Sequence, residues 1–180
     1  QYDYDKVGAR VIARDSDNWF NVFTIDKGSD DGIEVNNNVI SNGGLVGIVT
    51  DVGPNYAIVR SIIDDYSNVS AMVTTTEDTC IIAGDLRLID EGKINLVKLT
   101  DSRDKVTVGD KVVTSDISSR FLPGILIGYI SEISMDSNNL TKSGHIATIV
   151  DFEHLSDVFV ILQTKDVTDT TCLLYTSPSP

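Results

Sequence analysis

The stretch LVGIVTDV at residues 45–52 recurs further along the chain as LIGYISEI at residues 126–133. Two more segments recur in the same order, namely IEVNNNVIS (33–41) as VTVGDKVVT (106–114) and VIARD (11–15) as IIAGD (81–85). Single strands rich in Val and Ile resemble one another by chance, but three ordered pairs favour an internal duplication. The period is longer than the 20 to 50 residues of solenoid repeats, so the pattern predicts two similar β-domains.

Twelve segments have the composition of β-strands, being rich in β-branched residues and bounded by Gly, Asn, Asp or Pro. They lie near residues 9–15, 20–26, 38–41, 45–52, 56–63, 69–75, 80–84, 93–99, 111–115, 125–133, 145–151 and 158–164. No stretch holds the apolar spacing of an amphipathic helix, and residues 151–155 could form one helical turn at most. We therefore expect an all-β fold without long helices.

Six strands per repeat are enough to close a small barrel, which removes exposed sheet edges. The expected architecture is two six-stranded β-barrels related by internal duplication. Gly47 and Gly128 occupy matching mid-strand positions, where a glycine commonly marks a barrel corner. The repeat is compatible with two ways of connecting the barrels. In a sequential arrangement the barrels would split near residue 78, whereas in a nested arrangement one barrel would be inserted into the other.

The composition of the chain excludes several function classes. Its 180 residues include 27 acids and 14 bases, a net charge of −13, which disfavours binding to nucleic acid or to anionic lipid. Cys80 and Cys172 define neither a disulfide framework nor a metal site. The sequence has no signal peptide and no run of 18 apolar residues. It starts without Met, so we expect a fragment whose membrane anchor would lie upstream.

A hydrolase of chymotrypsin-like architecture is the alternative that a double β-barrel suggests. The two histidines, His145 and His154, follow most of the acids and serines, so the order His, Asp, Ser of that triad is not met. Ser70 and Ser115 lack the glycine-rich surround that shapes an oxyanion hole. Any such hydrolase would be inactive, and we expect no catalytic residue.

Metal and nucleotide sites have equally little support. Asp26, Asp30 and Asp31 lack the spacing and the distant glutamate of a calcium loop. The glycines form no G-x-G-x-x-G turn. We expect no metal and no cofactor.

One loop, Arg120, Phe121, Leu122 and Pro123, is a candidate protein-contact site. Arg120 and the serines before it mark a turn, and Pro123 restrains the backbone. In one interpretation Phe121 folds back and caps a barrel. In the other, Phe121 and Leu122 stay exposed as an apolar patch that contacts another barrel or a synthase.

Three segments in this order and spacing resemble the extracytoplasmic part of the MreC family of bacterial rod shape-determining proteins. The first segment comprises residues 9–15, Trp19 and residues 25–28. The second comprises residues 31–33, 39–40 and 44–49. The third comprises residues 109–115, Phe121, residues 123–125 and Gly128. The resemblance covers residues 9 to about 163. It departs at residues 116–120, where the family has a glycine-rich turn.

The resemblance implies a nested domain organisation. Residues 8–42 and 116–165 would form the first β-barrel, and residues 43–115 the second, inserted barrel. Residues 1–7 would be the end of a coiled coil. Residues 166–180, which end in Pro-Ser-Pro, match nothing before them and are expected to be a foreign extension outside the fold.

The resemblance also implies a function, that of a non-enzymatic scaffold of the cell-elongation machinery. The protein would lie on the extracytoplasmic face of the bacterial cell membrane, held by a single-pass anchor upstream of this chain. It would link the MreB and MreD complex to peptidoglycan synthases. The implied partners are a class-B penicillin-binding protein, RodA and further copies of the same chain as a homodimer or larger assembly.

Overall fold

The computed structural model describes residues 4–14 and 21–165, which form an all-β molecule. Its twelve strands are β1 (Lys6–Arg14), β2 (Val22–Ile25), β3 (Asn38–Ser41), β4 (Gly44–Val52), β5 (Ala57–Ser61), β6 (Asn68–Val73), β7 (Thr79–Ala83), β8 (Lys93–Leu99), β9 (Lys111–Thr114), β10 (Leu126–Met135), β11 (Lys142–Thr148) and β12 (Asp157–Ile161). Three short 3-10 helices join them, η1 (Ser29–Asp31), η2 (Leu86–Glu91) and η3 (Phe152–His154). All twelve predicted strands are present, so the expectation of an all-β fold without long helices is confirmed. The expected foreign tail lies outside the described residues.

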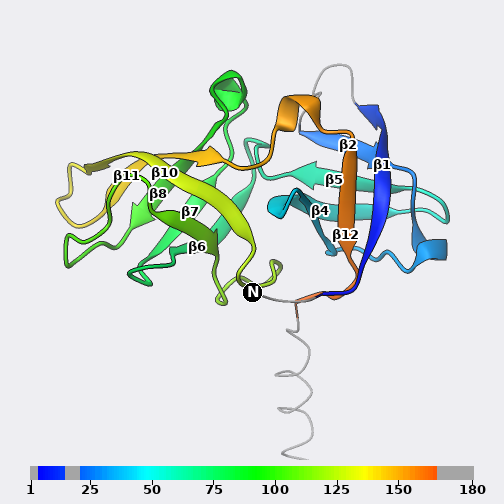
Figure 1. Cartoon of the computed structure of the whole chain (residues 1–180), viewed down its shortest axis with the longest axis horizontal. Helices are drawn as coiled ribbons and strands as arrows, with labels where there is room; N and C mark the ends of the chain where they lie inside the picture. Colours follow the sequence, from blue (N-terminus) through cyan, green and yellow to red (C-terminus); the bar gives the residue numbers. More distant parts are fainter. Residues whose placement is uncertain (1–3, 15–20, 166–180) are drawn as a thin grey trace, which may run out of the picture.

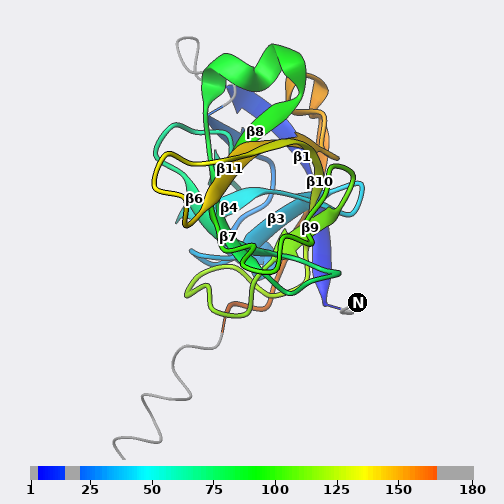
Figure 2. The ribbon, with the colours of Figure 1, turned by 90° about the vertical axis from the view of Figure 1, so that its left-hand side faces the viewer.

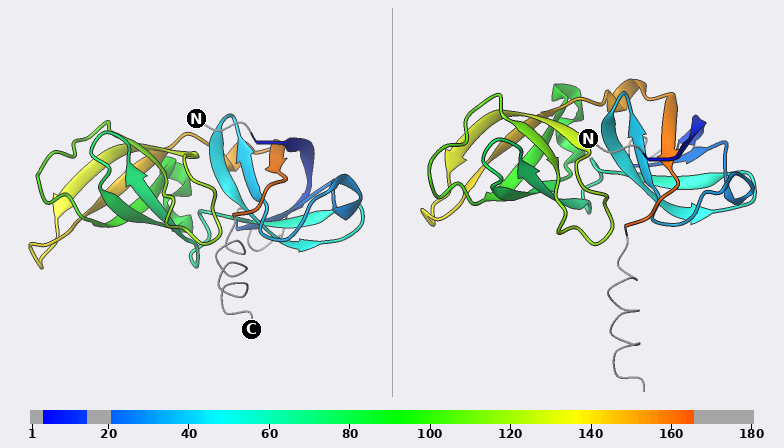
Figure 3. Two further views of the ribbon diagram at one scale, coloured as in Figure 1. Left: turned by 90° about the horizontal axis from the view of Figure 1, so that it is seen from below. Right: turned by 60° about the horizontal axis from the view of Figure 1, so that its bottom comes forward.

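The strand pairings close into two rings that lie side by side (Figure 1). The first ring has the order β4-β3-β12-β1-β2-β5 and is closed by the pairing of β4 with β5. The second ring has the order β10-β9-β6-β7-β8-β11 and is closed by the pairing of β10 with β11. Figure 2 looks at the molecule from the side of the second ring, and Figure 3 shows both rings from below. Closure of six strands leaves no exposed sheet edge within a ring.

The first ring contains both ends of the described chain. Strand β1 pairs with β12, and Val7 faces Val160 in this antiparallel ladder. This is the pairing that a nested arrangement requires and that a split near residue 78 would not produce. The second ring, in contrast, is built from the continuous stretch β6 to β11.

The expected boundaries of the nested parts are wrong. Strands β4 and β5 pair with β3 and β2 in the first ring, although residues 43–115 were expected to be the inserted barrel. Strands β10 and β11 pair with β9 and β8 in the second ring rather than with β1. The reason is the turn between β3 and β4. Asn42 and Gly43 both have positive φ, 51° and 80°, which makes a two-residue hairpin and keeps β4 beside β3.

Gly47 and Gly128 lie at equivalent places in the two rings. Each is next to a register shift, where β4 slips against β3 and β10 slips against β9. A Cβ atom at Gly47 would lie 2.0 Å from the carbonyl oxygen of Arg60, and one at Gly128 would lie 2.0 Å from that of Ala147. At both positions, a neighbouring strand approaches so closely that a residue with a Cβ atom would not fit.

The interior of both rings is filled by aliphatic side chains that alternate with outward-facing residues along the strands. In β7, for example, Cys80 and Ile82 are buried while their neighbours are partly exposed. Fully buried residues include Val39 and Val49 in the first ring and Leu96 in the second. Over residues 4–14 and 21–165, no helix has both the length and the apolar character needed to span a membrane.

Candidate functional site

The loop between β9 and β10 contains the predicted contact residues. Phe121 is 5% exposed and Leu122 is 2% exposed, and both belong to the apolar core. The hydroxyl of Ser118 accepts the N–H groups of Arg120 (3.3 Å) and Phe121 (3.0 Å), which turns the chain inward. Arg120 is exposed and Pro123 half-buried. The hypothesis of an exposed Phe121 and Leu122 patch is therefore wrong, because both side chains fold back into the core.

Asn38 of the first ring holds this loop of the second ring. Its Oδ1 accepts the N–H of Leu122 at 2.8 Å, and its Nδ2 donates to the carbonyl of Arg120 at 3.0 Å. Nδ2 also lies 3.3 Å from the carbonyl of Asn36. Asn38 is fully buried, so these bonds replace water around both the amide and the loop backbone. One side chain thus connects the two rings.

Thr114 closes the same loop from within the second ring. Its hydroxyl donates to the carbonyl of Leu122 at 2.6 Å and accepts the N–H of Ile125 at 2.8 Å. Gly124 follows with φ of 81°, a left-handed conformation that favours glycine. The loop is therefore fixed at both ends by buried hydrogen bonds.

A second set of contacts joins the rings through their backbones. Gly44 of β4 is the parallel partner of Leu126 of β10. The connections between the rings pack closely as well, since a Cβ atom at Gly44 would lie 2.2 Å from Cγ2 of Ile149, between β11 and β12, and one at Gly84 would lie 2.0 Å from the carbonyl oxygen of Asp64, between β5 and β6. We call these contacts, together with the Asn38 bonds, the junction. Its close packing indicates that the rings are fused rather than loosely tethered.

A groove of about 530 Å³ lies beside the junction, between the two rings. Its lining comes from β1, β3 and β12 on one side and from β6, β9 and β10 on the other, and consists of Tyr4, Lys6, Ile40, Gly43, Met72, Thr74, Lys111, Val113, Gly124, Ile125, Leu126 and Ile161. We call it the inter-ring groove. Among these described residues two are cationic and none is acidic, in a chain with a net charge of −13.

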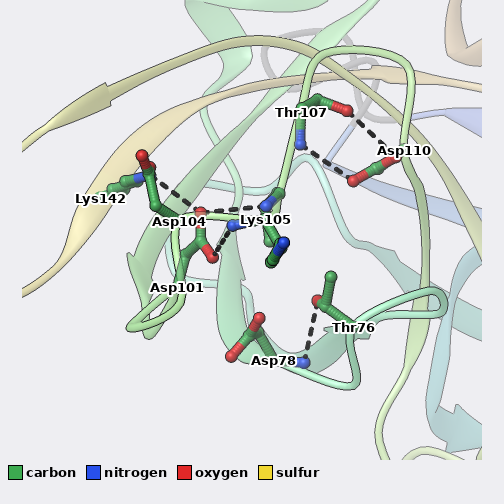
Figure 4. A network of polar contacts seen from close by, with 9 residues as sticks. Thr76, Asp78, Asp101, Asp104, Lys105, Thr107, Asp110 and Lys142 are labelled. Atoms are coloured by element: carbon green, nitrogen blue, oxygen red, sulfur yellow. Dashed lines mark hydrogen bonds and ion pairs between the residues drawn. The ribbon is translucent and has the colours of Figure 1, made fainter.

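A polar network inside the second ring has a structural role (Figure 4). Nζ of Lys142 lies 2.8 Å from the Asp101 carboxylate, which also accepts the N–H groups of Lys105 and Val106. Burial raises the pKa of Asp101, but these three hydrogen bonds outweigh it and hold the pKa below its usual range. Hydrogen bonds to Asp101 and Asp104 raise the pKa of Lys142. The network fastens β11 to the segment that follows β8.

The histidines do not assemble a hydrolytic site in the described part of the chain. Nδ1 of His145 contacts the Glu132 carboxylate, and Nδ1 of His154 lies 2.9 Å from Asp151. Ser131 donates to the backbone carbonyl of His145 and not to its imidazole. Among the described residues, no group of three His, Cys, Asp or Glu side chains could hold a metal ion.

The model of the family described as rod shape-determining protein MreC, barrel core, matches residues 11–162. The chain belongs to the MreC family. Cell shape-determining protein MreC of Listeria monocytogenes is 34% identical over 170 residues, which cover 91% of this chain and 56% of the relative. The chain spans about half the length of the curated MreC relatives that it matches.

Solved structures of MreC proteins share the fold. MreC of Listeria monocytogenes has a TM-score of 0.79 and 36% identity, with 88% of this chain and 76% of that chain covered. A complex between penicillin-binding protein PBP2 and MreC from Helicobacter pylori has a TM-score of 0.66 at 13% identity, with 88% and 99% covered. At that identity the second likeness establishes the fold alone.

Sequence reasoning missed the role of Asn38. The run Asn36, Asn37, Asn38 stands where the second repeat has Gly109, Asp110 and Lys111, and this difference is the one local signal. A repeat that keeps its apolar positions but loses its polar ones indicates that the polar residues serve different neighbours.

Proposed function

We propose that this chain is the extracytoplasmic barrel part of a non-enzymatic scaffold that organises bacterial cell elongation. The observation that carries the proposal is membership of the MreC family over residues 11–162, whose curated relatives are named cell shape-determining proteins. Two fused rings with buried loops suit this role, because a scaffold must hold partners in a fixed relation.

The proposed partners are a class-B penicillin-binding protein, RodA and the MreB and MreD complex. Support for the first comes from the complex of PBP2 with MreC from Helicobacter pylori. A single-pass anchor upstream of this chain would place it outside the cell membrane, and copies would associate as dimers or larger assemblies. Arg120 stays a candidate contact because its side chain is exposed next to the junction.

We also propose that the two rings arose by internal duplication. Ring order supports this, since β4, β3, β12, β1, β2 and β5 correspond in turn to β10, β9, β6, β7, β8 and β11, with every pairing antiparallel in both rings. The three sequence repeats fall on corresponding strands. β12 alone comes out of sequence order, so the first ring is a circular permutation of the second.

Co-purification tests the proposed function. The full-length protein that contains this chain, tagged and cross-linked in growing cells, should recover a class-B penicillin-binding protein and RodA. Depletion of the protein should turn rods into spheres. Recovery of neither partner, together with unchanged cell shape on depletion, would contradict the proposal.

A further inference from the structure

The inter-ring groove differs in chemistry from three other grooves on the described surface. Three other grooves each contain carboxylates, namely Asp90, Glu91, Asp151 and Glu153 in one, Asp26 and Asp157 in another, and Glu132 in the third. The described lining of the inter-ring groove contains Lys6 and Lys111 and no acid. An anionic group would meet repulsion over most of this chain and attraction here.

The two lysines are free to bind an incoming anion. Both residues are exposed, and neither ammonium group lies within 4.0 Å of a described carboxylate. Asp110, the residue before Lys111, uses its carboxylate to accept the N–H of Thr107 at 2.9 Å. Neither lysine of the groove therefore forms an ion pair with a described carboxylate.

The floor between the lysines is apolar and belongs to both rings. Ile40 and Ile161 come from the first ring, and Met72, Val113 and Leu126 from the second. Such a floor favours an aliphatic side chain over a bare ion, and Met72 is a flexible side chain that adapts to different occupants. A volume of about 530 Å³ lies within the usual range of ligand sites.

We propose that the inter-ring groove binds a segment of a partner protein in which aliphatic side chains alternate with carboxylates. The aliphatic side chains would pack on the floor, and the carboxylates would pair with Lys6 and Lys111. An anionic membrane fits less well, because a net charge of −13 repels it and two lysines are too few to compensate. The inference rests on the proposed function in that the occupant is a protein.

A short synthetic peptide that alternates glutamate with leucine is the probe. Titrated into the isotopically labelled chain, it should shift the amide NMR signals of Lys6, Ile40, Met72, Lys111 and Leu126. The same peptide with glutamine in place of glutamate should bind at least tenfold more weakly. The double variant K6E/K111E should also lose at least tenfold. The matched control K98E/K105E, which reverses two exposed lysines outside the groove, should bind like the wild type.

Five results would overturn the inference, four from the binding experiments and one from sedimentation. The first is a set of NMR signal shifts outside the groove, and the second is equal binding of both peptides. The third is a loss of affinity in K98E/K105E equal to that in K6E/K111E. The fourth is binding to phosphatidylglycerol vesicles that K6E/K111E abolishes, which would identify a lipid as the occupant. A dimer in sedimentation equilibrium that K6E/K111E dissolves would instead identify a second copy as the occupant, and would overturn it too.

A binding assay with a purified class-B penicillin-binding protein separates the two proposals. If that protein binds the wild type and K6E/K111E equally and the acidic peptide does not bind, the groove inference fails and the proposed function stands. If the peptide binds in the groove and the penicillin-binding protein binds neither chain, that partner fails and the groove stands.

Discussion

At the residue scale, Asn38 connects the two rings through its side-chain amide. Replacing it with alanine removes the hydrogen bonds to Leu122 and Arg120 and leaves the N–H of Leu122 buried without a partner. An unsatisfied buried group of this kind costs about 1–3 kcal/mol. We expect Asn38→Ala to lower the free energy of unfolding by about 2–3 kcal/mol in urea titrations.

Asn55→Ala is the matched control for Asn38. Asn55 is an exposed residue of the turn between β4 and β5, so its replacement should change stability by less than about 0.5 kcal/mol. Equal effects of the two substitutions would contradict the role assigned to the Asn38 amide.

Phe121 provides a second test at this scale. Because its side chain is buried in the core, Phe121→Ala should destabilise the chain by about 3–5 kcal/mol. Ile117 lies in the same loop and is 68% exposed, so Ile117→Ala should have little effect. Thermal unfolding of both variants measures the difference. A Phe121→Ala variant as stable as the wild type would contradict the contribution of Phe121 to the core.

At the scale of elements, Asp85 caps the short helix η2. A hydrogen bond from Arg87 lowers the pKa of Asp85 from 3.8 to about 2. A carboxylate whose pKa is lower in the folded chain stabilises it above pH 3.8, and this contribution is lost as the pH falls toward 2. Asp85→Asn should therefore cost up to about 1 kcal/mol at pH 7, since Arg87 is exposed, and almost nothing at pH 2. A cost in urea unfolding that is the same at both pH values would contradict this.

The close approach of neighbouring strands at Gly47 and Gly128 gives the second prediction at this scale. Gly47→Ala and Gly128→Ala would each force a Cβ atom to within 2.0 Å of a carbonyl oxygen on the next strand, so each should cost about 2–3 kcal/mol. Gly8 in β1 is the control, since a Cβ atom there meets Phe159 at an ordinary 3.5 Å. Gly8→Ala should be neutral or slightly stabilising. Chemical unfolding measures the stability of the three variants. A larger loss of stability in Gly8→Ala than in the other two would contradict this prediction.

The strands could be predicted from the sequence more fully than their pairing. β-Branched runs between turn residues gave all twelve segments, because local propensity decides them. Ring membership depends on which turns are tight, and Asn42-Gly43 was the signal that fixes β4 beside β3. The burial of Phe121 was one of two interpretations of its loop, and local sequence could not decide between them, because the loop is held by Asn38, which is distant in sequence. The inter-ring groove could not be predicted at all, since its two lysines meet only in the fold.

At the scale of the whole molecule, the junction makes the two rings one rigid body. Native-state hydrogen exchange tests this claim most directly, by measuring the free energy of opening at the amides of Val39 and Val160 in the first ring and of Ile82 and Val112 in the second. We expect one common value for both rings and an equal decrease in both for Asn38→Ala. Separate values for the two rings, with Asn38→Ala affecting one of them alone, would contradict it.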